Sequence, residues 1–336
     1  MFNIIGHASR TAATAYCDIS RAPMSGSDVR HVAVLLREVV DLIHPGPGKI
    51  LVDATIGEGG HAEVLLKEME GEGCLIGLDR DRQALEVAER RLGEPGPSLI
   101  LVHTDFALLE EVLESLEVEG LDGVLLDLGV SSLQLEQTER GFAYRLAARL
   151  DMRMDTRQEL DAWKVVNCYE ERELARIISG YGEERWASRI ARSIAFERKR
   201  APIDTTDRLA EIVKEAIPAA ARRSGGHPAR RTFQAIRLEV NGELRSLEEV
   251  LPQTMRHLRS GGRMVVISYH SLEDRMVKRF LADNGSRCSC PMDEECACGK
   301  AEPLRILTPR PIRPEPKEVE YNPKSRSAKL RAAKKR

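Results

Sequence analysis

Residues 53–61 read Asp-Ala-Thr-Ile-Gly-Glu-Gly-Gly-His, and this stretch is the most informative about the fold. It follows the apolar run at 49–52 and precedes a helical pattern from His61 to Glu70. Glycines let a backbone turn sharply and approach a ligand closely. A helix that starts directly afterwards offers free N–H groups. The order strand, glycine loop, helix therefore predicts a nucleotide-handling turn, although the glycine spacing differs from Gly-x-Gly-x-x-Gly.

Further short apolar runs lie on both sides of this loop, and several end on an acid or a glycine. Helical patterns separate the early runs, as at Arg80–Leu92. This alternation predicts an α/β fold with a parallel, Rossmann-like sheet covered by helices on both faces. The predicted strands are 49–53, 74–79, 98–103, 123–127 and 263–269.

The strand spacing breaks after Asp127, and the next strand pattern starts near Arg263. Helical patterns fill the interval, at 170–180, 183–200 and 206–217. An inserted all-helical domain is the simplest interpretation. We therefore divide the chain into a sheet domain at 31–135, an inserted helical domain at 136–235 and a second sheet segment at 236–336. Residues 1–30 are predicted to be a disordered extension, with a transit peptide or a start at Met24 as alternatives.

Acidic residues stand at the ends of the predicted strands. Asp79 ends the second strand, where a carboxylate can accept hydrogen bonds from both ribose hydroxyls. Asp105-Phe106 follows the third strand and offers an acceptor and a ring for an adenine base. Asp127 ends the fourth strand. The carboxyl ends of parallel strands meet at one edge, so these residues predict an adenosine pocket that fits NAD and S-adenosylmethionine equally.

Eight motifs that stand in one order carry a resemblance to a known family. Together they resemble the bacterial 16S rRNA (cytosine-N4)-methyltransferase family over nearly all of His31–Arg331. The motifs are His31-x-x-Val-Leu-Leu-x-Glu38, Asp53-Ala-Thr-Ile-Gly-Glu-Gly-Gly-His61, Asp127-Leu-Gly-Val-Ser-Ser132, Glu139-Arg-Gly-Phe142, Leu150-Asp-Met-Arg-Met-Asp155, Arg231-Thr-Phe-Gln234, Ser268-Tyr-His-Ser-Leu-Glu-Asp274 and Asn322-Pro-Lys-Ser-Arg-Ser-Ala-Lys-Leu-Arg331.

This resemblance implies a class I S-adenosylmethionine methyltransferase fold with a helical domain inserted after the fourth strand. It implies methyl transfer to N4 of a cytosine in the decoding region of small-subunit rRNA, so the expected partner is the 30S particle. The chain departs from the family pattern at Ala33, Ala62 and Ala148-Arg149. By motif position, the implied cofactor contacts are Gly59, Gly60, His61, Asp79, Phe106, Asp127 and Gln134.

The N4 amine of cytosine is a poor nucleophile because its lone pair is delocalised into the ring. An acceptor for its proton would localise that lone pair. Asp127 is the candidate acceptor, and its role as a cofactor contact is the alternative. Five residues share helical spacing: Arg231, Phe233, Gln234, Arg237 and Asn241. The polar ones can face the substrate, and the alternative is a partly buried helix that packs on the sheet, which explains Phe233 better. His270-Ser271 follow the fifth strand and can either line the pocket or cap the next helix, with Ser271 as the N-cap.

The overall charge limits how the protein can bind RNA. The net charge is −2, so RNA affinity must come from local basic surface. Arginine clusters at Arg198–Arg200, Arg222-Arg223 and Arg230-Arg231 are candidates, with a solvated helix surface as the alternative. At the basic C-terminal end, the resemblance aligns 327–333 with the last strand of the family, which implies that Lys329 and Arg331 are sheet-edge residues, and 334–336 is predicted as a free tail.

The seven cysteines form no disulfide framework, which predicts a reducing, cytoplasmic location. A zinc site is an alternative for the four clustered cysteines, Cys288, Cys290, Cys296 and Cys298. Their spacing is tighter than usual, and no metal ligand is assigned. No apolar run is long enough to span a membrane. The oligomeric state is left open, with a homodimer as one alternative.

Two other classes of function compete with the methyltransferase. A nicotinamide-dependent oxidoreductase shares the glycine loop and Asp79, but it would want a Gly-x-Gly-x-x-Gly fingerprint. A ribosome-assembly factor without catalytic activity would keep the RNA surface and need not keep the cofactor loop.

Overall fold

The computed structural model describes residues 3–5, 33–94, 96, 98–144, 147–223, 226–286 and 303–336. Its strands form one sheet in the order β1-β4-β3-β2-β5-β6-β9-β8-β7. The five central strands are parallel, and β9 is antiparallel to β6. The strands are β1 Asn3–Ile5, β2 Ile50–Asp53, β3 Cys74–Asp79, β4 Leu99–His103, β5 Leu121–Asp127, β6 Leu258–Ser268, β7 Gly285–Ser286, β8 Leu304–Ile306 and β9 Lys329–Lys335.

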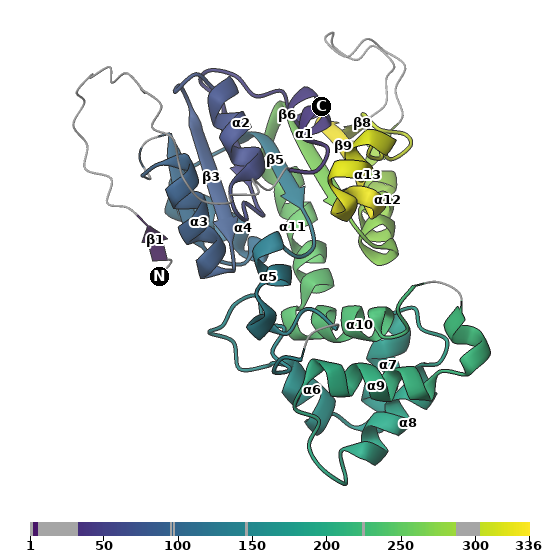
Figure 1. Cartoon of the computed structure of the whole chain (residues 1–336). Coiled ribbons are helices and arrows are strands. Elements are labelled where there is room, and N and C mark those ends of the chain that lie inside the picture. The colour runs from purple at the N-terminus through teal and green to yellow at the C-terminus, as the bar shows by residue number, and fades with distance from the viewer. Residues whose placement is uncertain are drawn as a thin grey trace.

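Helices cover both faces of this sheet and form a second group below it (Figure 1). Successive strand residues alternate between the two faces, as pleating requires. Leu51 packs in one core with side chains of α1 and α2, and Val52 packs in the other with side chains of α4 and α11. The sheet-covering helices are α1 Leu36–Ile43, α2 Gly60–Glu68, α3 Arg82–Leu92, α4 Leu109–Ser115, α11 Glu243–His257 and α12 Ser271–Asn284, and the short α13 Pro316–Tyr321 lies near the C-terminal end.

These elements confirm the α/β, Rossmann-like class I fold. Each of the five strands predicted from the sequence is present, with ends shifted by a few residues. The strand order reverses between β2 and β5, because β3 and β4 lie on one side of this pair and β6 on the other. Open α/β sheets bind ligands at such a switch point, outside the carboxyl ends of the strands.

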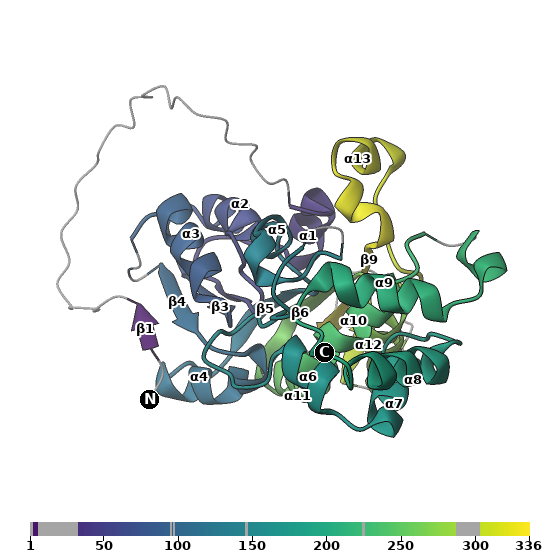
Figure 2. The same ribbon diagram turned by 60° about the horizontal axis from the view of Figure 1, so that its bottom comes forward.

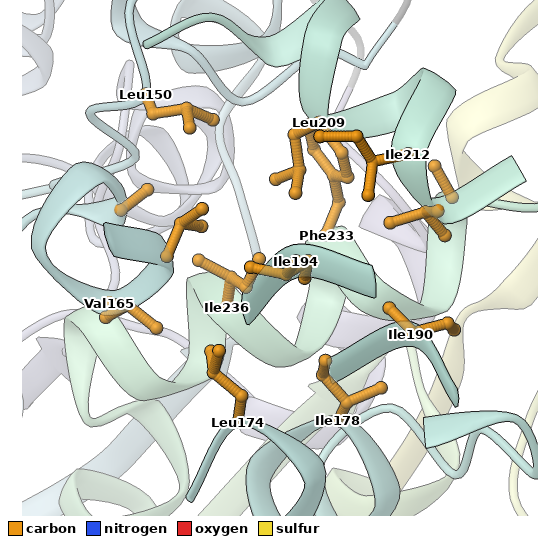
Figure 3. Packing of buried hydrophobic residues seen from close by; sticks show 14 of the residues in the cluster. Leu150, Val165, Leu174, Ile178, Ile190, Ile194, Leu209, Ile212, Phe233 and Ile236 are labelled. Atoms are coloured by element: carbon orange, nitrogen blue, oxygen red, sulfur yellow. The ribbon is translucent and has the colours of Figure 1, made fainter. Parts of the chain in front are cut away.

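The chain leaves the sheet after β5 through α5 Ser132–Glu136 and enters a helical unit with its own core. Figure 3 shows this core, in which Leu174, Ile194 and Ile236 come from three different helices. The helices are α6 Ala162–Cys168, α7 Glu171–Gly180, α8 Ala187–Glu197, α9 Thr206–Ala216 and α10 Arg230–Asn241.

The predicted domain boundary at 235 falls inside α10. Phe233, Ile236 and Val240 all pack into the helical core, so this helix belongs to the helical unit along its whole length. Gly242 then adopts a left-handed conformation with φ of 59°, where α10 ends and α11 begins. Figure 1 shows α10 between the other helices of the unit and the sheet, and Figure 2 shows the same unit from below.

The C-terminal end differs from the prediction. Lys334 and Lys335 belong to β9, which lies between β6 and β8 and is not at the sheet edge. The prediction of a free tail at 334–336 is therefore wrong, since Lys335 Nζ donates to the Met255 carbonyl at 2.6 Å. Lys329 and Arg331 both bind Asp274, at 3.0 and 2.7 Å. The sequence shows that these residues are basic, but it does not show that Asp274, more than 50 residues earlier in the chain, neutralises them.

Two sequence features fall mostly outside the described residues. Asn3–Ile5 pairs antiparallel with β4, and the rest of the predicted extension up to residue 30 is not described. The four clustered cysteines at 288–298 also lie outside the described residues, so the zinc alternative stays a prediction. Within the described part of the chain, no group of side chains suits a metal ion, and no helix is long and apolar enough to cross a bilayer.

Candidate active site

A cavity of about 680 Å³ lies at the switch point of the sheet, between the strand ends and the helical unit. Its size falls within the range of about 300–1,000 Å³ that is usual for small-molecule sites. Six of the seven residues that we predicted as cofactor contacts line it: Gly60, His61, Asp79, Phe106, Asp127 and Gln134.

The glycine loop connects β2 to α2 as predicted. Gly57 and Gly59 both adopt positive φ angles, of 52° and 80°, which non-glycine side chains rarely tolerate. Gly59, the seventh predicted contact, is not among the described residues that line the cavity. A Cβ at Gly59 would lie 3.2 Å from the Leu92 side chain, so this glycine allows α2 to approach α3.

Asp79 lies at the end of β3 and accepts hydrogen bonds from the backbone N–H groups of Gly57 and Asp81, at 2.9 and 2.8 Å. These bonds tie the glycine loop to the neighbouring strand. Burial raises the pKa of Asp79 to about 6, although both hydrogen bonds favour the charged form. A carboxylate held in this way can accept hydrogen bonds from a ligand hydroxyl.

Phe106 lines the cavity, but its neighbour Asp105 does not do what the sequence suggested. Asp105 is not among the described lining residues, and it pairs with Arg80 at 2.8 Å. Its other contacts are the Ser246 hydroxyl and the N–H of Ala107. These partners occupy the carboxylate, so the assignment of Asp105 to an adenine amine is wrong in this geometry. Arg80 instead lies over the Phe106 ring, 5.4 Å from its centroid.

Gln134 belongs to a buried polar network that joins the two parts of the molecule. Its side-chain amide donates to Asp81 Oδ2 at 2.8 Å, and Arg140 donates to the same oxygen at 2.9 Å. Arg140 also donates to the carbonyls of Arg153 and Met154, in the loop that enters the helical unit. Both charges of the Arg140–Asp81 pair are at least 90% buried, so the network fixes the entry to the helical unit.

Asp127 stands at the end of β5 with three polar neighbours. Its Oδ1 accepts a hydrogen bond from the Tyr269 hydroxyl at 2.9 Å, and its backbone N–H donates to Thr55 Oγ1 at 2.6 Å. Its Oδ2 lies 3.4 Å from His61 Nε2. Burial and the nearby Asp127 charge raise the pKa of Tyr269 well above its usual value, so this phenol remains a proton donor. Asp127 is therefore an oriented carboxylate on the cavity wall.

His61 is buried, and neither ring nitrogen makes a hydrogen bond with the described residues. Asp53 lies nearby and is also buried. Burial raises the pKa of Asp53 to about 7, while the positive form of His61 opposes this shift. A buried imidazole at a cavity wall that lies 3.4 Å from Asp127 but makes no hydrogen bond among the described residues indicates a position that a ligand completes.

The helical unit supplies the opposite wall through α10. Arg231, Gln234 and Arg237 line the cavity, as their spacing predicted. Phe233 also lines it and packs into the helical core as well. Asn241 does not line it. It is buried, donates to the Met152 carbonyl and accepts from the Met154 N–H, both at 2.8 Å. This asparagine is therefore structural, holding the loop that precedes α6.

The residues after β6 both line the cavity and cap a helix. The N-cap of α12 is His270, with Glu273 three residues later completing a capping box, so the prediction of Ser271 as N-cap was off by one residue. Ser271 instead donates to Glu183 of the helical unit, which also binds Arg275 at 2.8 Å. The start of α12 therefore contacts the helical unit and links it to the sheet domain.

No role was predicted for Tyr269 and Arg140, which lie in quoted motifs, or for Asp81, which lies in a predicted helical stretch. Tyr269 is 142 residues from Asp127, and Arg140 is 59 residues from Asp81. An aromatic residue directly after a sheet strand was the available signal for Tyr269. The arginine directly before Gly141 in a quoted motif was the signal for Arg140, but neither signal identifies the partner residue.

Comparison with known proteins agrees with this geometry. The family model of the MraW methylase family matches residues 28–336. A relative in Symbiobacterium thermophilum, named ribosomal RNA small subunit methyltransferase H, is 51% identical over 303 residues, covering 90% of this chain and 95% of the relative. Relatives with the same name in Heliobacterium modesticaldum and Caldicellulosiruptor bescii are each 48% identical, covering 91% of this chain and at least 98% of their own length. The chain belongs to the MraW methylase family.

Proposed function

We propose that this protein transfers a methyl group from S-adenosylmethionine to N4 of a cytosine in the decoding region of 16S rRNA. The observation that carries the proposal is one cavity in which a carboxylate edge, Asp79 and Asp127, faces the arginine and glutamine side chains of α10. The names of the relatives support rRNA of the small subunit as the substrate. The proposal includes a cytoplasmic location and the 30S particle as partner.

The described residues fit the cofactor. Asp79 would accept from the ribose hydroxyls, Phe106 would pack against the adenine ring, and His61 would gain a partner for its unbonded ring nitrogens. At the strand ends the cavity wall carries the carboxylates of Asp79 and Asp127, which suit a cationic cofactor better than the anionic pyrophosphate of a dinucleotide. S-adenosylmethionine, when bound, supplies an activated methyl group on a positively charged sulfur.

Methyl transfer to an amine then needs alignment and a place for the proton. The target amine is aligned with the methyl group when the base is enclosed between the strand ends and α10. The base must leave its stack to reach this cavity, as in other enzymes that modify bases. We assign Asp127 as the acceptor for an N4 proton, because Tyr269 holds one of its oxygens and the carboxylate lines the cavity.

We also propose that the helical unit, predicted at 136–235 and continued to Asn241 by α10, recognises the RNA. Its wall of the cavity includes Arg230, Arg231 and Arg237. Arg237 binds Glu243 at 2.8 and 3.0 Å, while the side chain of Arg231 is 50% exposed. Exposed arginines beside a base pocket suit phosphate contacts around an unstacked nucleotide.

Calorimetric titration tests the cofactor assignment. We expect S-adenosylhomocysteine to bind with one site per chain and NAD to give no heat of binding. Binding of NAD would favour an oxidoreductase. Absence of binding by either ligand would favour an assembly factor without catalytic activity.

The affinity for S-adenosylmethionine is expected to depend on pH through Asp79. Burial raises the pKa of this carboxyl to about 6, and only its charged form accepts both ribose hydroxyls. Affinity should therefore be full at pH 7.5 and lost as the pH falls through about 6, by roughly tenfold at pH 5. Isothermal calorimetry across this range measures the change.

Asp79→Asn is the matched control for this pH dependence. It should bind weakly at every pH, with a flat profile between pH 5 and 7.5. Protonation of a buried acid whose folded pKa is raised stabilises the folded state, so Asp79 itself cannot cause unfolding as the pH falls. A wild-type affinity that stays constant down to pH 5 would contradict the role of Asp79.

Tyr269→Phe is expected to lower kcat by about 10- to 100-fold, since it removes one hydrogen bond to a charged group, worth about 1.5–3 kcal/mol. The KM for S-adenosylmethionine should change by less than about threefold, because Tyr269 acts through Asp127. Initial rates at several cofactor concentrations separate the two constants. A raised KM with unchanged kcat would instead assign Tyr269 to cofactor binding.

A further inference from the structure

A second cavity of about 680 Å³ lies in the helical unit beside the first. It is lined by residues before α8, residues after α9 and the start of α10. Arg230 and Arg231 line both cavities. Tyr144, on the wall of the first, stacks on His227, on the wall of the second, with ring centroids 4.4 Å apart. The two cavities therefore share a wall.

The second cavity is strongly positive. Among the described residues, its lining contains four arginines, Arg185, Arg222, Arg230 and Arg231, and a single acid, Glu184. Glu184 is buried, accepts from the Trp186 N–H at 2.9 Å and lies 3.8 Å from Arg231. This arrangement leaves an excess of positive charge for an anionic ligand.

Three of these arginines have no carboxylate within the described part of the chain to neutralise them, and one of the three, Arg222, donates to backbone carbonyls instead. Several exposed arginines elsewhere in the helical unit are paired, as Arg208 is with Glu197 at 2.8 Å. Among the described residues, the guanidinium groups of Arg185 and Arg230 have neither a hydrogen bond nor an ion pair. Arg230 is also the first residue of α10, where the helix dipole favours negative charge.

A flat stacking surface lies in the same cavity. The Arg185 guanidinium is 4.7 Å from the centroid of the Trp186 ring. Trp186 is partly buried against the helical core, and this packing holds its ring in place. Nucleic-acid bases stack on guanidinium planes and on aromatic rings in single-stranded RNA sites. The cavity thus combines cations for a phosphate with a platform for a base.

We propose that this second cavity binds the nucleotide that neighbours the target cytosine in the RNA strand. Its phosphate binds Arg230 and Arg231 at the shared wall, and its base stacks on the Arg185–Trp186 pair. The inference rests on the proposed function, since it places the target cytosine in the first cavity. The shared wall suits the phosphate that links two adjacent nucleotides, because the same arginines reach both cavities.

The double variant Arg185→Gln/Arg230→Gln tests the proposal in the full chain saturated with S-adenosylhomocysteine. The probe is a short oligoribonucleotide with the single-stranded decoding-region sequence. Affinity should fall about tenfold or more, and the slope of log K against log salt should shrink by about 0.7 for each lost phosphate contact. Arg172→Gln is the matched control, an exposed arginine on α7 that is not among the described lining residues of either cavity. It should change affinity by less than about twofold.

Fluorescence tests the stacking platform separately. The chain has two tryptophans, so Trp163→Phe leaves Trp186 as the single indole reporter. RNA should quench its emission, and Arg185→Gln should remove most of the quenching. An unchanged emission on saturation with RNA would contradict a base at this platform.

The outcomes separate this inference from the proposed function. If the wild-type protein does not bind the RNA at all, the proposed function itself fails. If the wild type binds and the double variant binds equally well, the second cavity is not a nucleotide site. Equal losses in the double variant and in Arg172→Gln would also overturn the inference, as would equal competition by an oligoglutamate peptide. Unchanged binding of S-adenosylhomocysteine shows that the variants are folded.

Discussion

Asp127→Asn is expected to lower kcat by about 10²–10⁴-fold, the usual contribution of a positioned general base. The substitution keeps the shape of the side chain, and its amide oxygen can still accept from the Tyr269 hydroxyl. What is lost is the negative charge that would take a proton from the amine. Single-turnover rates with excess enzyme measure the chemical step directly.

Cofactor binding distinguishes the two roles of Asp127. If it accepts the proton, Asp127→Asn should bind S-adenosylhomocysteine within about threefold of the wild type, a difference of less than about 1 kcal/mol. Asp41→Asn, an exposed acid on α1, is the control and should leave both constants unchanged. Near-normal kcat in Asp127→Asn would contradict a proton-acceptor role, and lost cofactor affinity alone would reassign the residue to binding.

Arg140→Met should destabilise the fold by about 3–5 kcal/mol, because it leaves Asp81 buried without its cation. Arg140 is 8% exposed and also binds two backbone carbonyls, so its removal opens the entry to the helical unit. Urea denaturation monitored by circular dichroism gives the free energy of unfolding. The loss should appear as a lower midpoint with little change in slope.

Arg245→Met is the matched control for that experiment. Arg245 pairs with Glu249 on the surface of α11, and its side chain is 85% exposed. Exposed ion pairs of this kind contribute about 0.2–1 kcal/mol to the free energy of unfolding. If Arg140→Met and Arg245→Met lower the free energy of unfolding by the same amount, the buried Arg140–Asp81 pair does not hold the sheet domain and the helical unit together. Partial recovery in Arg140→Met/Asp81→Asn would confirm that the unpaired charge causes the loss.

The fold and much of the cavity could be predicted from the sequence, because local patterns determine them. The carboxyl ends of parallel strands meet at one edge of a sheet, so an acid that follows a strand is expected at that edge. Asp79, Phe106 and Asp127 lie on the cavity wall as this rule predicts. The rule fails for Asp105, because Arg80 and Ser246 compete for that carboxylate and only tertiary packing brings them to it.

Pairings between distant residues could not be predicted. Gly59 belongs to the predicted loop, but whether it faces a ligand or the next helix depends on where Leu92 lies. The C-terminal lysines looked like a tail because a short basic strand lacks an apolar pattern. Pairing with β6 and β8 on both sides overrides that weak local preference.

Methyl transfer in vitro is the decisive measurement for the proposed function. The enzyme is incubated with labelled S-adenosylmethionine and small subunits from cells that lack this protein, and the rRNA nucleosides are analysed by mass spectrometry. We predict a gain of one methyl group per particle, on N4 of a single decoding-region cytosine. No transfer to these particles, or a methyl group on carbon 5 of cytosine, would contradict the proposed function.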